Sequence, residues 1–156
     1  MQNAECRMQS EDGMKILFVC TGNICRSPMA EVIFQNLCEK HHRNGVFASG
    51  AGTYACDEMT PEAYEALKIC GEKVPRKRIR ATQFEPRMTH EFDHIICMTR
   101  QHKNFIGNFA NVKTLDEYAG CGDIFDPFGY PLDVYIEVCK KLQKALGVLY
   151  NALFKE

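Results

Sequence analysis

The sequence predicts an α/β protein, a three-layer sandwich in which helices cover both faces of a four-stranded parallel sheet. Short apolar runs alternate with segments whose apolar residues recur at helical spacing. The first of these runs, Lys15–Cys20 (KILFVC), is continuously hydrophobic, as in a strand that is buried on both faces of a parallel sheet. The total of 156 residues fits one domain. Together these observations indicate a single sheet with helices on either side.

The predicted elements follow in order along the chain. Residues 1–13 are polar and lack periodicity, which predicts an unstructured tail ahead of a domain that spans residues 14–156. After the first strand, Ser27 and Pro28 predict the N-cap and the first residue of a helix. The other predicted elements are strands at 46–51, 92–98 and 112–115 and helices at 61–70, 100–109 and 132–154.

Composition narrows the class of protein. The formal net charge is −1, from 19 basic and 20 acidic residues, so the chain lacks the strong basicity of nucleic-acid-binding proteins. No apolar run approaches the ~18 residues that a membrane span needs. There are nine cysteines, with no Cys-x-x-Cys pair and no histidine at zinc-ligand spacing. We therefore expect free thiols, a cytoplasmic protein and no metal site.

The segment between the first strand and the first helix predicts an anion-binding loop. It lies at the carboxyl end of a strand, where open α/β sheets bind ligands. Successive N–H groups of such a loop and the helix N-terminus after it bind phosphate oxygens. Gly22 permits a close backbone approach, and Asn23 tolerates left-handed dihedral angles. The planar guanidinium of Arg26 can bind two phosphate oxygens at once.

Cys20 lies at the start of this loop, where it becomes a candidate nucleophile. Helix N-termini and adjacent cations lower the pKa of a thiol from ~8.5 to roughly 3.5–7.5. We expect a Cys20 thiolate, with Ser27 donating a hydrogen bond to it, that attacks a bound phosphate and forms a cysteinyl-phosphate. The alternative is a buried strand cysteine without a catalytic role, the commonest fate of this residue type. The spacing of Cys20, Arg26, Ser27 and Pro28 favours the nucleophile.

The stretch VCTGNICRSPMAE, Val19–Glu31, resembles the signature of low-molecular-weight protein tyrosine phosphatases, and the resemblance covers the chain from about Met14 onward. It implies a Rossmann-like fold, no cofactor, phosphotyrosine proteins or small aryl phosphates as substrates, and inhibition by inorganic phosphate and vanadate. It also implies that Ser49 joins the polar network that holds Asn23. The loop residues that it places around the phosphate are Thr21, Gly22, Asn23, Ile24, Cys25 and Ser27, with Cys20 as nucleophile and Arg26 as clamp.

Hydrolysis of an aryl phosphate also needs a proton donor, because tyrosine, with a pKa near 10, leaves poorly as an anion. Asp126 lies in a turn-rich loop, DPFGYP, but a loop Asp before Pro is usually only a turn former. The resemblance singles out Asp126, because family members carry an Asp-Pro motif before their last helix. Phe128 stands where the vertebrate form has the first of two tyrosines, and it can still stack on a phosphotyrosine ring. Tyr54 is expected to be an aromatic wall of the substrate cleft.

Three alternative functions stay open at this point. A thioredoxin-coupled arsenate reductase has the same fold and cysteine loop, and Cys97 lies near its second redox cysteine, although no third thiol follows soon after. A protein-arginine phosphatase carries Thr where Ile24 stands, so Ile24 favours an aromatic substrate. An inactive phosphate-binding module would not need Cys20, Arg26 and Asp126 together.

Three further features carry weaker predictions. Cys25 either packs within the loop or acts as a resolving thiol that forms a disulfide with oxidised Cys20. Thr99 stands where members of the family commonly carry Asp. The run Lys73–Arg80 holds five basic residues, which predicts a solvated face, with a substrate-steering rim as the alternative.

Overall fold

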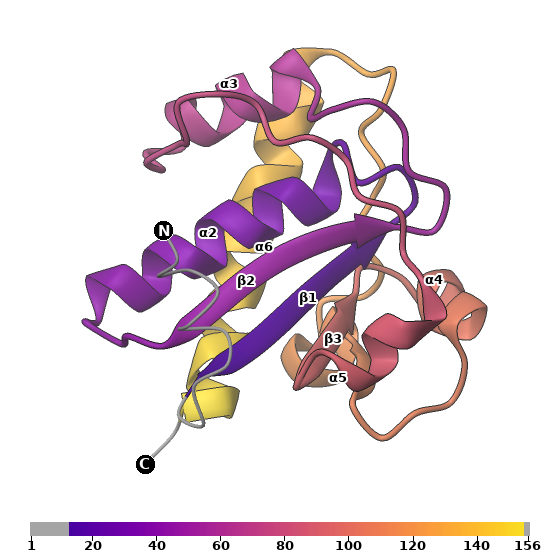
Figure 1. Cartoon of the computed structure of the whole chain (residues 1–156). Coiled ribbons are helices and arrows are strands. Elements are labelled where there is room, and N and C mark those ends of the chain that lie inside the picture. Colours follow the sequence, from indigo (N-terminus) through magenta and orange to yellow (C-terminus); the bar gives the residue numbers. More distant parts are fainter. Residues whose placement is uncertain (1–12, 155–156) are drawn as a thin grey trace.

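The computed structural model describes residues 13–154, so the predicted tail at 1–13 lies, except for Gly13, outside the described residues (Figure 1). Four parallel strands form one sheet in the order β2-β1-β3-β4. The predicted fold class is confirmed. The strands are β1 (Met14–Cys20), β2 (Val46–Gly52), β3 (His94–Cys97) and β4 (Val112–Thr114).

Helices cover both faces of this sheet (Figure 1). Four helices pack on one face, and α4 with the short 3-10 helix η1 lies on the other. The sandwich therefore has three layers, as predicted. The helices are α2 (Arg26–Lys40), α3 (Pro61–Ile69), η1 (Pro86–His90), α4 (Arg100–Ile106), α5 (Leu115–Ala119) and α6 (Leu132–Phe154).

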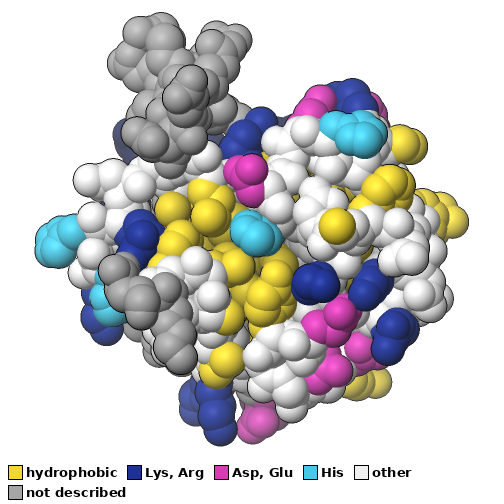
Figure 2. Space-filling view, turned by 90° about the horizontal axis from the view of Figure 1, so that it is seen from below, with side chains coloured by type: hydrophobic (Ala, Val, Ile, Leu, Met, Phe, Trp, Pro, Cys, Tyr) yellow, Lys and Arg dark blue, Asp and Glu magenta, His cyan; other side chains and the backbone are white. Residues whose placement is uncertain are grey.

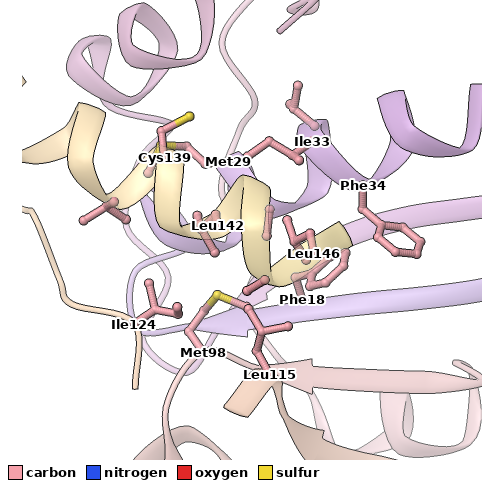
Figure 3. Packing of buried hydrophobic residues seen from close by; sticks show 14 of the residues in the cluster. Phe18, Met29, Ile33, Phe34, Met98, Leu115, Ile124, Cys139, Leu142 and Leu146 are labelled. Atoms are coloured by element: carbon pink, nitrogen blue, oxygen red, sulfur yellow. The ribbon is translucent and has the colours of Figure 1, made fainter. Parts of the chain in front are cut away.

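Strand β1 is buried on both faces, which explains its continuous hydrophobicity. Ile16 and Phe18 point into the larger core with α2 and α6, where the rings of Phe18 and Phe34 lie 5.7 Å apart (Figure 3). Leu17 and Val19 point into the smaller core beneath η1. Because successive strand residues alternate between faces, one apolar run supplies both cores. The strand's last residue, Cys20, is thereby fixed at the carboxyl edge of the sheet.

Some element bounds differ from the predictions for local reasons. The helix expected at 100–109 ends at Ile106, because Gly107 adopts a φ of +117°. The strand expected to reach residue 115 ends at Thr114, and a short helix, α5, that was not predicted begins there. Thr114 and Glu117 form a capping box at its start. Ser27, predicted to be an N-cap, lies inside the first turn of α2, and Cys25 holds the N-cap position.

The surface shown in Figure 2 carries lysine and arginine side chains close to aspartate and glutamate side chains, around a group of hydrophobic residues. This mixture of charges on one face agrees with the formal net charge of −1. An anion must therefore be held by local geometry. Within residues 13–154, no helix combines the length and the apolar character that crossing a membrane requires.

Candidate active site

The loop between β1 and α2 is held by the segment that follows β2. The carbonyl oxygens of Cys20, Thr21, Gly22 and Ile24 accept hydrogen bonds of 2.8–3.0 Å from backbone amides within residues 53–60. These bonds anchor the loop through its carbonyl groups, and we expect its N–H groups to face the interior. Such a ring of inward N–H groups at a helix N-terminus binds anions. The loop therefore suits the phosphate that the sequence predicts for it.

Two glycines of β2 allow the loop to approach the sheet. A Cβ atom on Gly52 would lie 2.5 Å from the carbonyl oxygen of Thr21 and 2.9 Å from the amide nitrogen of Asn23. A Cβ atom on Gly50 would lie 2.7 Å from Asn23 Nδ2. Any larger residue at these positions would displace the loop. Asn23 itself has a φ of +56°, which turns the chain at the middle of the loop.

The side chain of Asn23 connects the loop to Ser27. Its Nδ2 donates to Ser27 Oγ at 2.6 Å, and its Oδ1 accepts from the amide of Thr82 at 2.9 Å. Because Ser27 Oγ accepts from Asn23, its own proton is directed to Cys20 Sγ, 3.0 Å away. The Ser27 amide also donates to this sulfur, at 3.4 Å. Both bonds converge on the sulfur that the sequence predicts to be the nucleophile.

Ser49 does not take the place that the resemblance implied for it. The hydrogen bonds of the Asn23 side chain go to Ser27 and Thr82. The reason is the alternation of the strand: a Cβ atom on Gly50 would face Asn23, so the side chain of Ser49 points to the opposite face.

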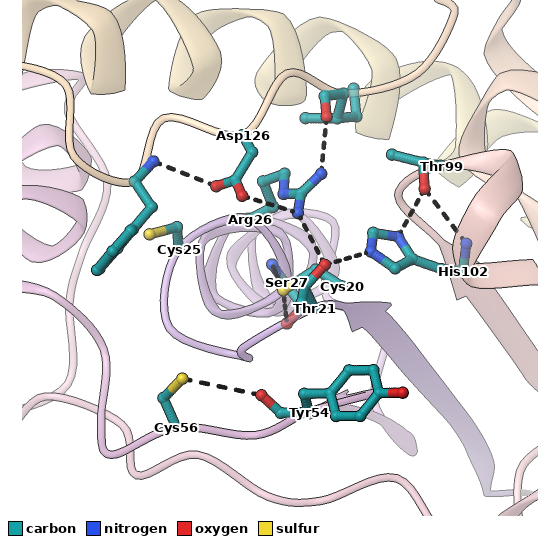
Figure 4. A network of polar contacts seen from close by, with 12 residues as sticks. Cys20, Thr21, Cys25, Arg26, Ser27, Tyr54, Cys56, Thr99, His102 and Asp126 are labelled. Atoms are coloured by element: carbon teal, nitrogen blue, oxygen red, sulfur yellow. Dashed lines mark hydrogen bonds and ion pairs between the residues drawn. The ribbon is translucent and has the colours of Figure 1, made fainter. Parts of the chain in front are cut away.

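Arg26 is placed to bind an anion in the loop. Only 5% of the residue is exposed, and its Nη1 donates to the carbonyl oxygen of Ile124 at 3.0 Å. Its Nη2 lies 3.4 Å from both Thr21 Oγ1 and Asp126 Oδ2 (Figure 4). Among the described residues, Arg26 Nε is the only buried side-chain nitrogen or oxygen without a hydrogen-bond partner. An unpaired buried donor is costly, and a phosphate oxygen would satisfy this one.

A buried histidine continues the network from Thr21 to α4. Thr21 Oγ1 lies 2.8 Å from His102 Nε2, and His102 Nδ1 lies 2.9 Å from Thr99 Oγ1 (Figure 4). Burial, and then the charge of Arg26, lower the pKa of His102 to about 4, so the ring is neutral near neutral pH. Thr99 also caps α4 by accepting from the His102 amide at 3.3 Å. In this chain the network at Thr99 therefore consists of a hydroxyl and a neutral imidazole.

Asp126 lies beside Arg26 at a cavity of about 130 Å³. Its side chain is 52% exposed, and its Oδ1 accepts from the amide of Phe128 at 3.1 Å. This half-exposed position suits a group that exchanges protons with substrate and water. The cavity brings together most of the predicted residues, since its lining consists of Cys20, Thr21, Gly22, Ile24, Cys25, Arg26, Cys56, Asp126 and Phe128.

Two residues at the mouth of this cavity differ from expectation. The side chain of Tyr54 is not part of the cavity lining, and its ring packs edge-on against Phe105 at 5.8 Å. Cys56, which the sequence did not point to, lines the cavity instead. The amide of Cys56 donates to the Gly22 carbonyl at 3.0 Å, so the backbone that anchors the loop also positions this thiol.

The other predicted redox cysteines are protonated thiols. Cys25 Sγ lies 3.4 Å from Tyr135 Oη, and burial raises the pKa of Cys25 to about 11. Cys97 is fully buried in β3, and burial raises its pKa to about 12. A buried, protonated Cys97 is poorly suited to the thiol exchange of an arsenate reductase. Within the described part of the chain, no group of three or more His, Cys, Asp or Glu side chains could hold a metal ion.

Comparison with known proteins agrees with this geometry. The model of the low molecular weight phosphotyrosine protein phosphatase family matches residues 15–156. The chain belongs to this family.

Relatives of this low molecular weight phosphatase differ in the substrates that they are named for. This chain is 38% identical over 160 residues to the protein-arginine-phosphatase of Bacillus subtilis (strain 168), and the alignment covers 92% of this chain and 99% of that protein. It is 35% identical over 143 residues to the low molecular weight protein-tyrosine-phosphatase PtpB of Staphylococcus haemolyticus (strain JCSC1435), covering 87% and 97%. Among solved structures, a mutant of the YwlE arginine phosphatase with a phosphorylated active site serine matches with a TM-score of 0.82 and 34% identity, covering 92% and 97%.

Proposed function

We propose that this phosphatase hydrolyses phosphotyrosine in proteins, and small aryl phosphates, through a cysteinyl-phosphate intermediate. The observation that carries the proposal is the meeting of three groups at one cavity. Cys20 and Asp126 both line it, and between them lies Arg26, whose Nε is buried without a partner. An anion bound there would contact the nucleophile, the clamp and the acid together.

In the first step, the Cys20 thiolate attacks phosphorus in line with the leaving oxygen. The S–P bond forms as the P–O bond to the aryl group breaks, and Asp126 gives its proton to the departing oxygen. The loop amides and Arg26 stabilise the charge on the three equatorial oxygens. Stabilisation of this kind is usually the largest contribution to such a reaction.

In the second step, water hydrolyses the phosphocysteine. Asp126, now ionised, takes a proton from the attacking water, the P–S bond breaks, and the electron pair returns to Cys20 as a thiolate stabilised by Ser27. Inorganic phosphate is released. The structural relative with a phosphorylated serine in its active site supports transfer of phosphate to a side chain in that protein, and we extend this step to Cys20.

The walls of the cavity favour an aromatic substrate. Ile24 and Phe128 line it and offer apolar surface to a phenyl ring. A phosphoarginine carries a guanidinium group, whose N–H donors would lie against Ile24 without hydrogen-bond acceptors, and this costs free energy. Phosphoarginine is the second candidate, because the Bacillus subtilis relative at 38% identity is named a protein-arginine-phosphatase.

Substrate choice is tested by measuring kcat/KM for phosphotyrosine, phosphoarginine and phosphoserine, with and without vanadate. We expect phosphotyrosine to exceed phosphoarginine by at least about tenfold, and vanadate and inorganic phosphate to inhibit both. In an Ile24→Thr variant this ratio should fall, because the threonine hydroxyl can accept from a guanidinium. A wild-type enzyme that prefers phosphoarginine would overturn the substrate assignment.

The roles of Cys20 and Asp126 are tested with matched variants. Cys20→Ser should abolish turnover. Asp126→Asn should slow aryl phosphates with poor leaving groups by roughly 10²–10⁴-fold and those with good leaving groups much less. Asp133→Asn, an exposed acid at the start of α6 that does not line the cavity, is the control and should behave as wild type. An equal effect of Asp126→Asn on both kinds of substrate would remove the acid assignment.

We further propose that the phosphatase acts in the cytoplasm. The eight cysteines within the described residues are all free thiols, which fits a reducing compartment.

A further inference from the structure

A second hollow lies between η1 and α4, on the sheet face opposite α2. It has a volume of about 280 Å³ and is lined almost entirely by apolar side chains. Two of these are aromatic and well exposed: 50% of Phe105 and 41% of Phe109 is accessible to solvent. We call this hollow the aromatic groove, and its lining residues are Phe84, Pro86, Thr89, Phe105, Ile106 and Phe109.

The aromatic groove has a firm floor. Phe84 is buried and belongs to the smaller core, and Ile106 packs against that core. The hydroxyl of Thr89, the one polar side chain in the lining, donates to the carbonyl oxygen of Pro86 at 2.9 Å. A preformed apolar hollow of this kind binds an apolar side chain without first having to be ordered.

Tyr54 links the aromatic groove to the mouth of the catalytic cavity. Its amide donates to the Thr21 carbonyl of the phosphate loop at 2.8 Å, and its ring packs edge-on against Phe105 at 5.8 Å. Tyr54, whose side chain is drawn in Figure 4, is 69% exposed as a residue, so this bridge is open to a bound chain. A substrate whose phosphorylated residue enters the cavity can therefore cross Tyr54 and reach the groove.

The charges beside the aromatic groove are paired with one another. Arg87 of η1 lies 3.1 Å from Glu85 and 2.7 Å from Glu91. This edge therefore carries one cation flanked by two anions, a formal charge of −1, and disfavours an acidic side chain. The lining and this edge together favour an uncharged, apolar side chain.

We propose that the aromatic groove binds an apolar side chain of a protein substrate, a few residues from the phosphorylated residue. This inference rests on the proposed function, because it assumes that the phosphorylated residue occupies the cavity at Cys20. It makes protein segments, rather than small aryl phosphates, the preferred substrates. The groove supplies selectivity among phosphorylated sites that the small cavity, which contacts only the phosphorylated residue, cannot supply.

The test is a series of phosphotyrosyl peptides in which one Phe or Leu is moved through a Gly/Ser background. The scan covers four positions on either side of the phosphorylated residue, because four extended residues reach about 13 Å. We expect one or two neighbouring positions to raise kcat/KM about tenfold over Ser at the same position. Each value is divided by the kcat/KM of the same enzyme for a small aryl phosphate, so that changes in the chemistry cancel.

Phe109→Ser should remove this positional preference, and Phe105→Ser should do the same. Both side chains are well exposed, so the variants are expected to fold. The matched control is Val148→Ser on α6, which is also 41% exposed and lies outside the groove; it should keep the wild-type preference. A preference that survives both phenylalanine substitutions would overturn the assignment of the groove.

Two other outcomes would also overturn the inference. In one, the enzyme hydrolyses the small aryl phosphate but its kcat/KM for the peptides does not depend on the position of the apolar residue. This result leaves the proposed function intact. The other is a flat scan together with a dimer in sedimentation experiments that Phe109→Ser dissociates, which would assign the groove to a second copy of the chain. Failure of the proposed function is distinct from both, because the small aryl phosphate would then not be hydrolysed. If phosphoarginine is the preferred residue, the same scan is run with phosphoarginyl peptides.

Discussion

His102 and Glu31 lie near the phosphate loop and both make stability depend on pH between about 4 and about 7, with opposite signs. Burial, followed by Arg26, lowers the pKa of His102 from 6.5 to about 4. Burial raises the pKa of Glu31, in α2, from 4.5 to about 7. Its carboxylate approaches β2 closely, since a Cβ atom on Gly50 would lie 3.1 Å from Glu31 Oε1. Both groups are therefore uncharged in the folded protein between about pH 4.5 and about pH 7.

The two signs follow from which state binds the proton. Below its ordinary pKa of 6.5, His102 is protonated in the unfolded chain but not in the fold, so its contribution to stability is lost as pH falls towards about 4. Glu31 is protonated in the fold between 4.5 and about 7 but not in the unfolded chain, so its contribution is present at low pH and lost as pH rises through about 7. One pKa unit is worth about 1.4 kcal/mol, so the shifts from 6.5 to about 4 and from 4.5 to about 7 correspond to at most about 3.5 kcal/mol for each group.

We therefore expect these two contributions to oppose each other in the wild type. In His102→Gln, the free energy of unfolding should increase by up to about 3 kcal/mol as pH falls from about 7 to about 4.5, relative to the wild-type profile. In Glu31→Gln it should decrease by a similar amount over the same range. The double variant should return to the wild-type profile. Urea unfolding at several pH values measures all four proteins.

His94, whose pKa burial also lowers, is present in all four proteins and cancels from the differences. The reasoning is refuted if both single variants follow the wild-type pH profile. It is also refuted if the two slopes have the same sign.

Three more predictions concern the phosphate loop. Gly52→Ala should lower the free energy of unfolding by roughly 1–3 kcal/mol and weaken inhibition by phosphate, because the added methyl would lie 2.5 Å from a loop carbonyl oxygen. The control is Gly147→Ala, where a Cβ atom would meet nothing within 4 Å. This variant should be more stable than the wild type by up to about 1 kcal/mol in urea unfolding. Ser27→Ala should slow alkylation of Cys20 by iodoacetate near neutral pH about tenfold, since the sulfur loses a hydrogen bond; an unchanged rate would contradict this role. Iodoacetamide near neutral pH should label Cys20 before Cys25, because the pKa of Cys25 is raised to about 11. After treatment with peroxide, mass mapping should find a Cys20–Cys25 disulfide. Irreversible sulfonic acid on Cys20 without that disulfide would count against Cys25 as the resolving thiol.

The sequence predicted well those parts of the site that are contiguous along the chain. The loop from Cys20 to Ser27 lies between one strand and one helix, so its geometry follows from local patterns. The proton donor is harder to predict, because composition alone does not choose among 20 acidic residues. The turn-rich loop makes Asp126 a candidate, and the family's Asp-Pro motif singles it out. The structure places it 3.4 Å from Arg26.

Residues that reach the site from other elements were harder to predict. His102 belongs to α4 and meets Thr21 across 81 positions of sequence, which no local pattern reveals. The resemblance implies a place for Ser49 in the Asn23 network, but the strand's alternation directs its side chain to the opposite face of the sheet. The ring of Tyr54, in the turn after β2, packs against Phe105 of α4, a contact that no local pattern reveals. Helix α5 does have a local signal in the sequence, the capping box of Thr114 and Glu117.

The anchoring of the phosphate loop through its carbonyl groups has a consequence for inhibition. Because residues 53–60 hold four of these carbonyls in the folded protein, the ring of amides is already shaped when an oxyanion arrives. Association then requires little loss of backbone entropy, and the affinity for small oxyanions is set by the rigidity of a segment that need not touch them. Substitutions between Ala55 and Met59 that loosen this support should therefore weaken vanadate and phosphate alike, by accelerating their dissociation.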